Sequence, residues 1–215
     1  MIRTRAISER TLRALAVFGL PARRCRRTPD VRIAVRRAAA ALTSAPCVLL
    51  TGPSGAGKST ALSALARLQS ARDTRTIRIR PDALARDERT PPEIIRRAVG
   101  PMLSLLSRCG LSDATLLATP ARNLSEGQRW RLALCAALSR ADRPGATRTL
   151  IIADELCAGL DELTALGVLA GAASICSRTP GLVLAGATAR DDVAAMARGQ
   201  ARWRVIDLPT QEPRP

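Results

Sequence analysis

A glycine-rich segment, GPSGAGKST at residues 52–60, is the first part of the chain whose residue types and spacing could do chemistry. It follows the apolar run CVLLT and matches the P-loop pattern, in which backbone N–H groups and a helix N-terminus surround phosphate groups. We predict that Lys58 contacts the β- and γ-phosphates and takes part in catalysis, and that Ser59 ligates Mg²⁺. A glycine-rich turn without a ligand is the alternative. The residues predicted to bind nucleotide here are Gly52, Pro53, Ser54, Gly55, Ala56, Gly57, Lys58, Ser59 and Thr60.

Lysine usage supports this prediction. Lys58 is the single lysine among the 34 basic residues, and all the others are arginines. A compact ammonium fits against phosphate oxygens where a broad guanidinium does not. The chain therefore uses lysine only where a P-loop requires it.

A second acidic element follows the apolar run LIIA at residues 150–153. There Asp154 is expected to hold Mg²⁺ through water, and Glu155 is placed to act as general base on the attacking water. Taken alone, the two carboxylates could simply end a buried strand. Together with the upstream P-loop, they predict a site for nucleotide hydrolysis.

The segment NLSEGQR at residues 123–129 has the pattern of a helix start. Ser125 can cap the helix, Gln128 stands three residues later as in a capping box, and Gly127 leaves backbone amides uncovered. Uncovered amides at a helix N-terminus also bind anions, so the segment fits both a plain cap and a phosphate contact.

In sequence and position, residues 124–128 resemble the LSGGQ signature of the ABC ATPases, and CAGLD at residues 157–161 resembles the D-loop of that family. The resemblance covers roughly residues 45–195. It implies a head-to-tail homodimer in which Ser125, Gly127 and Gln128 of one subunit contact ATP bound at Lys58 of the partner subunit. ATP and Mg²⁺ are the implied cofactors. The residues themselves fit ATP and GTP alike.

Three departures from the family pattern bear on activity. There is no glutamine between Gln69 and Gln128 where transporter cassettes carry the Q-loop glutamine, and Ala189 or Arg190 stands where the switch histidine is expected. We therefore expect slow hydrolysis; the alternative is that Arg190 partly replaces the histidine by meeting the γ-phosphate as a cation. An adenine-stacking aromatic is also hard to identify, since Phe18 is the only aromatic before the P-loop, and an ordinary core role fits it as well.

The acidic Glu126 replaces a glycine of the commonest signature. In this the chain resembles a soluble, non-transport subgroup of ABC ATPases, some of which are fused to acetyltransferase-like domains. A chain of 215 residues has no room for an acetyltransferase domain beside the ATPase domain.

These residues need a sheet and helices to position them. Strand-like runs lie at 47–51, 76–80, 150–153, 182–185 and 203–208, and helical patterns lie at 59–69, 92–109, 126–140, 160–177 and 191–197. This alternation predicts an α/β fold, a P-loop NTPase of ABC ATPase type with a short helical insertion at about 81–123. We expect a basic N-terminal arm at 1–40, an ATPase domain at 41–208 and a disordered tail at 209–215.

Charge and composition suggest partners and exclude others. The net charge is +16, and residues 1–37 hold eleven arginines against two acidic residues, so we predict that this arm contacts nucleic acid, although coding bias explains part of the charge. Six scattered cysteines and no histidine argue against zinc and for buried thiols in a reducing compartment. No apolar run is long enough to span a bilayer, which favours a cytoplasmic protein over one carrying a transit peptide.

The leading functional hypothesis is an ATPase that dimerises around ATP and acts on a partner that the sequence does not name. A non-hydrolysing, ATP-dependent binding module is the first alternative, because the glutamine and histidine are missing. The ATPase subunit of a transporter is the second.

Overall fold

The computed structural model describes residues 9–17, 30–141 and 148–209. Its centre is a parallel sheet with the strand order β2-β3-β4-β1-β5. The strands are β1 (Cys47–Thr51), β2 (Arg75–Arg78), β3 (Thr149–Ala153), β4 (Leu182–Thr188) and β5 (Trp203–Asp207). The predicted α/β architecture is confirmed, with each strand within a few residues of its expected place.

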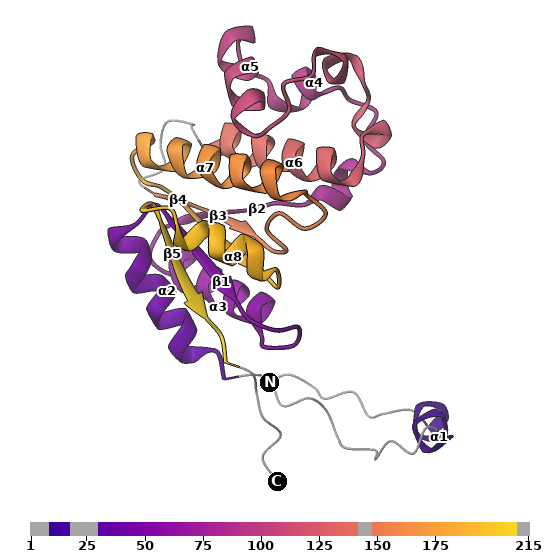
Figure 1. The fold of residues 1–215 in the computed structure, drawn as a ribbon, viewed down its shortest axis with the longest axis vertical. Helices are drawn as coiled ribbons and strands as arrows, with labels where there is room; N and C mark the ends of the chain where they lie inside the picture. The colour runs from indigo at the N-terminus through magenta and orange to yellow at the C-terminus, as the bar shows by residue number, and fades with distance from the viewer. Residues whose placement is uncertain (1–8, 18–29, 142–147, 210–215) are drawn as a thin grey trace.

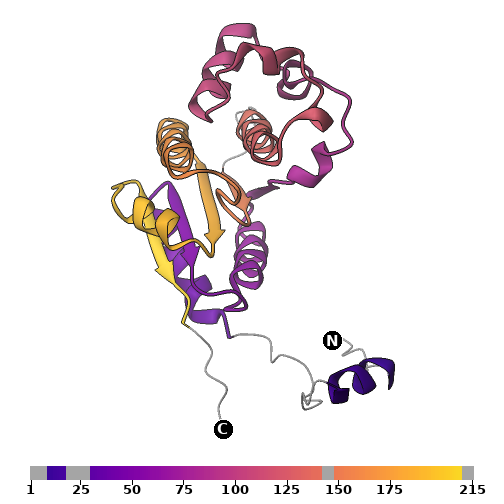
Figure 2. The ribbon, with the colours of Figure 1, turned by 45° about the vertical axis from the view of Figure 1, so that its right-hand side comes forward.

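Helices cover both faces of the sheet (Figures 1 and 2). Because strand side chains alternate between faces, Val48 and Leu50 pack with α2 (Arg32–Ser44) and α3 (Lys58–Ser70). Cys47 and Leu49 pack on the opposite face, within the core that α6, α7 and α8 cover. These helices span Glu126–Ala141, Glu162–Arg178 and Asp191–Arg198. Every residue of β1, β3 and β4 is buried, as expected of a parallel sheet covered on both sides.

Between β2 and α6 the chain forms helices and short 3₁₀ turns and no strand, at the upper end of the molecule in Figure 1. The elements are η1 (Pro81–Leu84), α4 (Pro91–Ile95), α5 (Val99–Arg108), η2 (Ala114–Ala118) and η3 (Ala121–Asn123). The predicted helical insertion is therefore confirmed.

One predicted helix was wrong. The segment 92–109, expected as a single helix, is divided into α4 and α5 at Arg96, whose backbone is left-handed with φ 50° and ψ 50°. Pro101 gives the physical reason, since a proline lacks the N–H for an interior helix bond but is tolerated in the first turn, where it lies in α5.

The predicted arm at 1–40 overlaps a packed helix. α2 begins at Arg32, and its Val35, Ala38 and Leu42 are buried against the sheet. α1 (Glu9–Val17) lies earlier in the arm, while residues 1–8 and 18–29 fall outside the described part of the chain. Residues 210–215 of the predicted tail also fall outside it. Within the described ranges no helix is long and apolar enough to cross a membrane.

Candidate nucleotide-binding site

The P-loop connects the end of β1 to the start of α3, the strand–loop–helix arrangement that its motif requires. Lys58 is the first residue of α3, and its half-buried side chain turns back over the loop. Its Nζ donates hydrogen bonds of 2.7 Å to the carbonyl oxygen of Gly52 and 2.8 Å to that of Pro53. The ammonium is thus held at the centre of the loop.

The N-terminus of α3 has no side-chain cap. Its N-cap residue is Gly57, in a left-handed conformation, and no side chain accepts from the first N–H groups. Ser59 follows in the first turn and is exposed. Uncovered amides and a helix dipole attract anions in general, so this helix start fits the predicted phosphate contact.

The loop is closed by a residue near the other end of the chain. Gly52 has φ 144°, and a Cβ atom there would lie 2.6 Å from the carbonyl oxygen of Leu208. Leu208 in turn donates its N–H to the carbonyl oxygen of Thr51 at 2.7 Å. Only glycine fits at position 52, for a reason that lies in the tertiary structure and that the sequence did not show.

Asp154 and Glu155 follow β3 at the same edge of the sheet as the P-loop. Leu49 of β1 and Ala153 of β3 both pair with Gly186 of β4, so their strands end side by side across β4. Both carboxylate residues are exposed, and the Glu155 N–H donates 3.2 Å to Asp154 Oδ1. The structure thus brings the two predicted acidic residues to the edge that holds the P-loop, the usual ligand edge of a parallel sheet.

Glu155 has a left-handed backbone, with φ 51°. Such a conformation costs about 1–3 kcal/mol in a residue with a side chain, and it recurs at functional sites. A hydrogen bond of 2.6 Å from the Leu156 N–H to the carbonyl oxygen of Ala187 fixes the next residue to β4. The unusual backbone therefore coincides with the predicted general base.

Residues 124–128, which resemble the ABC signature in sequence, lie at the start of α6. The predicted capping box is confirmed: the Ser125 N–H donates 2.9 Å to Gln128 Oε1, and the Gln128 N–H donates 3.2 Å to Ser125 Oγ. Gly127 lies against Leu160, whose Cδ2 would be 2.9 Å from a Cβ at position 127. Among the described residues, no hydrogen bond joins this helix start to the P-loop of the same chain.

Arg190 is, with Ala189, one of the two residues expected at the place of a switch histidine, and each nitrogen of its guanidinium donates a hydrogen bond. Nη1 donates to the carbonyl oxygens of Cys157, at 2.9 Å, and of Leu160, while Nε donates 3.1 Å to Asp192 Oδ1. An ion pair to Asp192 completes the contacts, and the hydrogen bonds from Arg190 lower the pKa of Asp192. The guanidinium points onto the segment after β3, a role that sequence reasoning missed, while Ala189 is exposed.

The segment that resembles a D-loop is firmly held. Burial raises the pKa of the Cys157 thiol to about 12. Asp161 ends the segment as the N-cap of α7, where its Oδ1 accepts a 2.9 Å hydrogen bond from the Thr164 N–H, and this bond lowers the pKa of Asp161. Phe18, the candidate for base stacking, lies outside the described residues, so the structure does not place it.

Comparisons with known proteins agree with this geometry. A family model described as the AAA ATPase domain matches residues 24–199. Among solved structures, the dimeric MJ0796, titled a bacterial ABC transporter cassette, is similar with 20% identity and a TM-score of 0.56 over 76% of this chain and 81% of that one. A dimeric MJ0796 structure bound to ADP and Pi has 21% identity and a TM-score of 0.54 over the same shares.

A further similar structure contains the archaeal ribosome recycling factor aABCE1, in complex with the ribosomal stalk protein aP1. It has 20% identity and a TM-score of 0.50, and the match covers 66% of this chain and 32% of that one. No curated protein matches. The two MJ0796 structures are cassettes by their titles, and their likeness to this chain shows a shared fold.

Proposed function

This chain belongs to the AAA ATPase domain family and has the fold of an ABC ATPase cassette, and from that premise we propose that it binds Mg-ATP at residues 52–60 and hydrolyses it slowly. One observation carries the proposal. A complete P-loop at the end of β1 and the carboxylates of Asp154 and Glu155 at the end of β3 share one edge of a parallel sheet. ATP hydrolysis needs a phosphate cradle and a placed base, and this edge offers both.

The residues present fit a nucleotide with its metal. Lys58 releases the carbonyl oxygens of Gly52 and Pro53 when phosphate oxygens replace them as acceptors. Ser59, exposed in the first turn of α3, supplies a hydroxyl ligand for Mg²⁺, and Asp154 holds its water shell. Bound magnesium would neutralise phosphate charge. Glu155 takes the proton of the attacking water as general base.

The second subunit completes the site in this proposal. Ser125, Gly127 and Gln128 lie at a helix start that packs against Leu160 and, among the described residues, has no hydrogen bond to its own P-loop. A second copy would bring such a helix to the nucleotide. Helix N-termini bind phosphate, so a head-to-tail pair would place each α6 over ATP on the partner subunit's Lys58. The two MJ0796 structures are dimers by their titles, which supports the proposal.

Slow hydrolysis follows from the engagement of Arg190. Its guanidinium is bound to Asp192 and to the carbonyl oxygens of Cys157 and Leu160, so it is turned away from a γ-phosphate contact. The same observation favours the second candidate function, an ATP-dependent binding module without turnover. Glu155 argues for hydrolysis. The compartment of the cell, proposed to be the cytoplasm, and the contact of the basic arm with nucleic acid remain predictions from sequence.

Turnover and assembly together test the proposal. The oligomeric state is measured by light scattering with Mg-ATP for the wild type, Glu155→Gln and the control Glu88→Gln, which changes an exposed carboxylate in the insertion, alongside phosphate release. We expect a stable ATP-dependent dimer in Glu155→Gln and turnover in the wild type and the control. ATP-dependent dimers without wild-type turnover would favour the binding module. Absence of nucleotide binding would refute both.

A further inference from the structure

A cavity of about 1360 Å³ lies between the sheet domain and the helical insertion. Its walls come from α3, β2, η1, the segment around α4, and α6. None of residues 52–60, Asp154 or Glu155 lines it, so it is separate from the nucleotide site. We call it the insertion groove.

Arginines form the sheet-side wall of the insertion groove. Arg67 comes from α3, Arg75 and Arg78 from β2, and Arg80 from the residues just after β2, and all four are exposed. Arg75 Nη1 donates 3.3 Å to the carbonyl oxygen of Arg140. Arg78 Nη2 donates 3.4 Å to Ser63 Oγ. The partners that orient these side chains are therefore uncharged.

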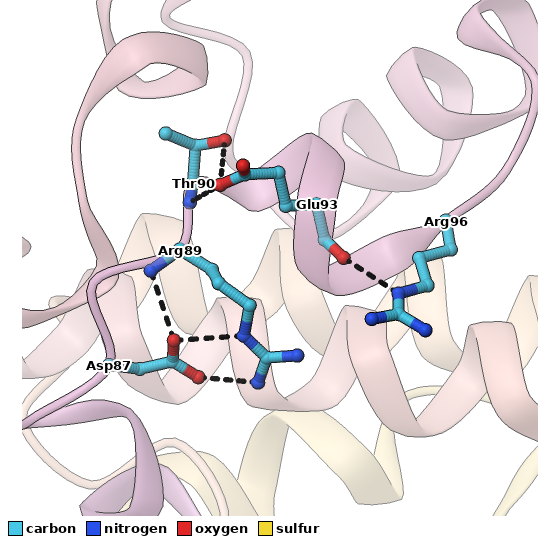
Figure 3. Close-up of polar contacts among 5 residues, drawn as sticks. All are labelled: Asp87, Arg89, Thr90, Glu93 and Arg96. Atoms are coloured by element: carbon cyan, nitrogen blue, oxygen red, sulfur yellow. Dashed lines mark hydrogen bonds and ion pairs between the residues drawn. The ribbon is translucent and has the colours of Figure 1, made fainter.

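The opposite wall repeats this pattern. Arg96 Nε donates 3.2 Å to the carbonyl oxygen of Glu93, as Figure 3 shows. Arg97 Nε donates 2.9 Å to Ser139 Oγ, and Arg140 Nε donates 3.1 Å to a carbonyl oxygen of its own helix. The hydrogen bonds of Arg96 and Arg140 set the directions of these two guanidiniums without neutralising their positive charges, because a carbonyl group carries no net charge.

Carboxylates are rare among the described residues that line the insertion groove. Asp87 is the one acidic residue among them, and both its oxygens accept hydrogen bonds from Arg89, at 3.0 Å from Nε and 2.6 Å from Nη2 (Figure 3). The carboxylate of the nearby Glu93 accepts a 2.7 Å hydrogen bond from the N–H of Thr90. Since Asp87 is paired with Arg89, the positive charge of the described lining comes from six further arginines: Arg67, Arg75, Arg78, Arg80, Arg96 and Arg140.

We propose that the insertion groove binds the phosphate backbone of a nucleic acid without regard to sequence. Guanidinium forks of fixed direction match phosphate oxygens in pairs. An acidic helix of a protein partner would need large exposed apolar side chains to pack on, whereas the exposed apolar lining is Ala83, Ala98 and Pro101. The part of the lining that the structure describes contains no aromatic residue and so offers no base-stacking platform that could read single bases.

The test measures fluorescence anisotropy of a labelled 20-nucleotide oligo(dT) and of a mixed-sequence duplex with the full chain, without nucleotide, across a salt series. The variant Arg78→Gln/Arg96→Gln removes one guanidinium from each wall. The control Arg178→Gln/Arg202→Gln removes the same charge from exposed positions outside the groove. We expect the groove variant to lose about tenfold or more in affinity and the slope of log K against log salt to fall by about two. The control keeps most of the affinity.

Two results would overturn the proposal. If both double variants bind equally well and deletion of residues 1–29 abolishes binding, the basic arm is the contact and the groove is not. If neither oligonucleotide binds while a labelled poly-glutamate peptide binds and is lost in the groove variant, the partner is an acidic protein segment. Because nucleotide is left out, these results do not depend on whether the P-loop hydrolyses ATP.

Discussion

The guanidinium of Arg190 donates a 2.9 Å hydrogen bond to the carbonyl oxygen of Cys157, and this contact joins the end of β4 to the segment that follows the general-base candidate. The same guanidinium also reaches the carbonyl oxygen of Leu160. A single side chain therefore fixes the course of the backbone beside Glu155.

Replacing Arg190 distinguishes a side chain that positions the backbone from one that contacts phosphate. We expect Arg190→Ala to lower the free energy of unfolding by about 1–3 kcal/mol, because two carbonyl oxygens lose a charged donor. Phosphate release should fall while ATP affinity stays unchanged. Urea denaturation, turnover and nucleotide titration measure the three quantities, with Arg202→Ala, which changes an exposed arginine, as control. A parallel loss of ATP affinity would show instead that the guanidinium meets the γ-phosphate.

The single lysine should not be replaceable by arginine. Lys58 lies within 2.7–2.8 Å of two loop carbonyl oxygens, a space that suits an ammonium and not a guanidinium. We expect both Lys58→Arg and Lys58→Ala to weaken binding of a fluorescent ATP analogue about tenfold or more, the size of one lost charged contact. Arg72→Ala, at an exposed position after α3, serves as control. Wild-type affinity in Lys58→Arg would contradict this account of the loop.

Two glycines of α7 form a matched pair for testing the packing of the insertion. A Cβ at Gly171 would clash with the carbonyl oxygen of Arg108, at the end of α5, whereas a Cβ at Gly167 would meet nothing within 4 Å. Gly171→Ala should destabilise the protein by about 1–3 kcal/mol through overpacking. Gly167→Ala should stabilise it by about 0.5–1 kcal/mol through helix propensity. Thermal unfolding measures the stability of both variants. Equal effects on stability would mean that α7 and α5 do not pack as described.

The thiol of Cys157 should resist labelling and affect stability at high pH. Burial disfavours the thiolate and raises the pKa from 9.0 to about 12 in the folded state. As pH rises, the Cys157 thiol loses its proton in the unfolded chain before it does so in the folded protein. The contribution of this group to the free energy of unfolding is therefore full below pH 9 and is lost as pH rises toward 12.

Mass spectrometry after alkylation at pH 8 checks this prediction, with and without denaturant. Cys157 should be modified only in the unfolded protein. Rapid modification of Cys157 in the native protein would show that the segment opens to solvent. In Cys157→Ser the fall in stability above pH 9 should be smaller than in the wild type.

Local signals in the sequence were enough for the sheet and for the residues around it. Apolar runs marked β1 and β3, the P-loop pattern placed Lys58 at the start of a helix, and Ser125 with Gln128 indicated a capping box that the hydrogen bonds confirm. The division of the segment 92–109 at Arg96 was missed, although Pro101 stands within that segment.

Contacts between distant parts of the chain were beyond the sequence. The glycine at position 52 is required by Leu208, and Arg190 turns toward Cys157, two relationships that no local pattern encodes. The insertion groove likewise gathers arginines from positions 67 to 140, which read along the chain as ordinary surface charges. The roles assigned to Glu155, Asp154 and Ser125 remain predictions.

The pairing of β1 with β4 and β5 sets the order in which the parts of the nucleotide site can form while the ribosome synthesises the chain. β1 carries the P-loop, yet both its neighbours, and Leu208 that closes over Gly52, come from residues 182–208. A nascent chain therefore exposes its phosphate-binding motif early and cannot shape it until the last strand has emerged. Until then the apolar β1 has no partner strand, and a chaperone that shields it would act between the synthesis of the motif and the completion of the site.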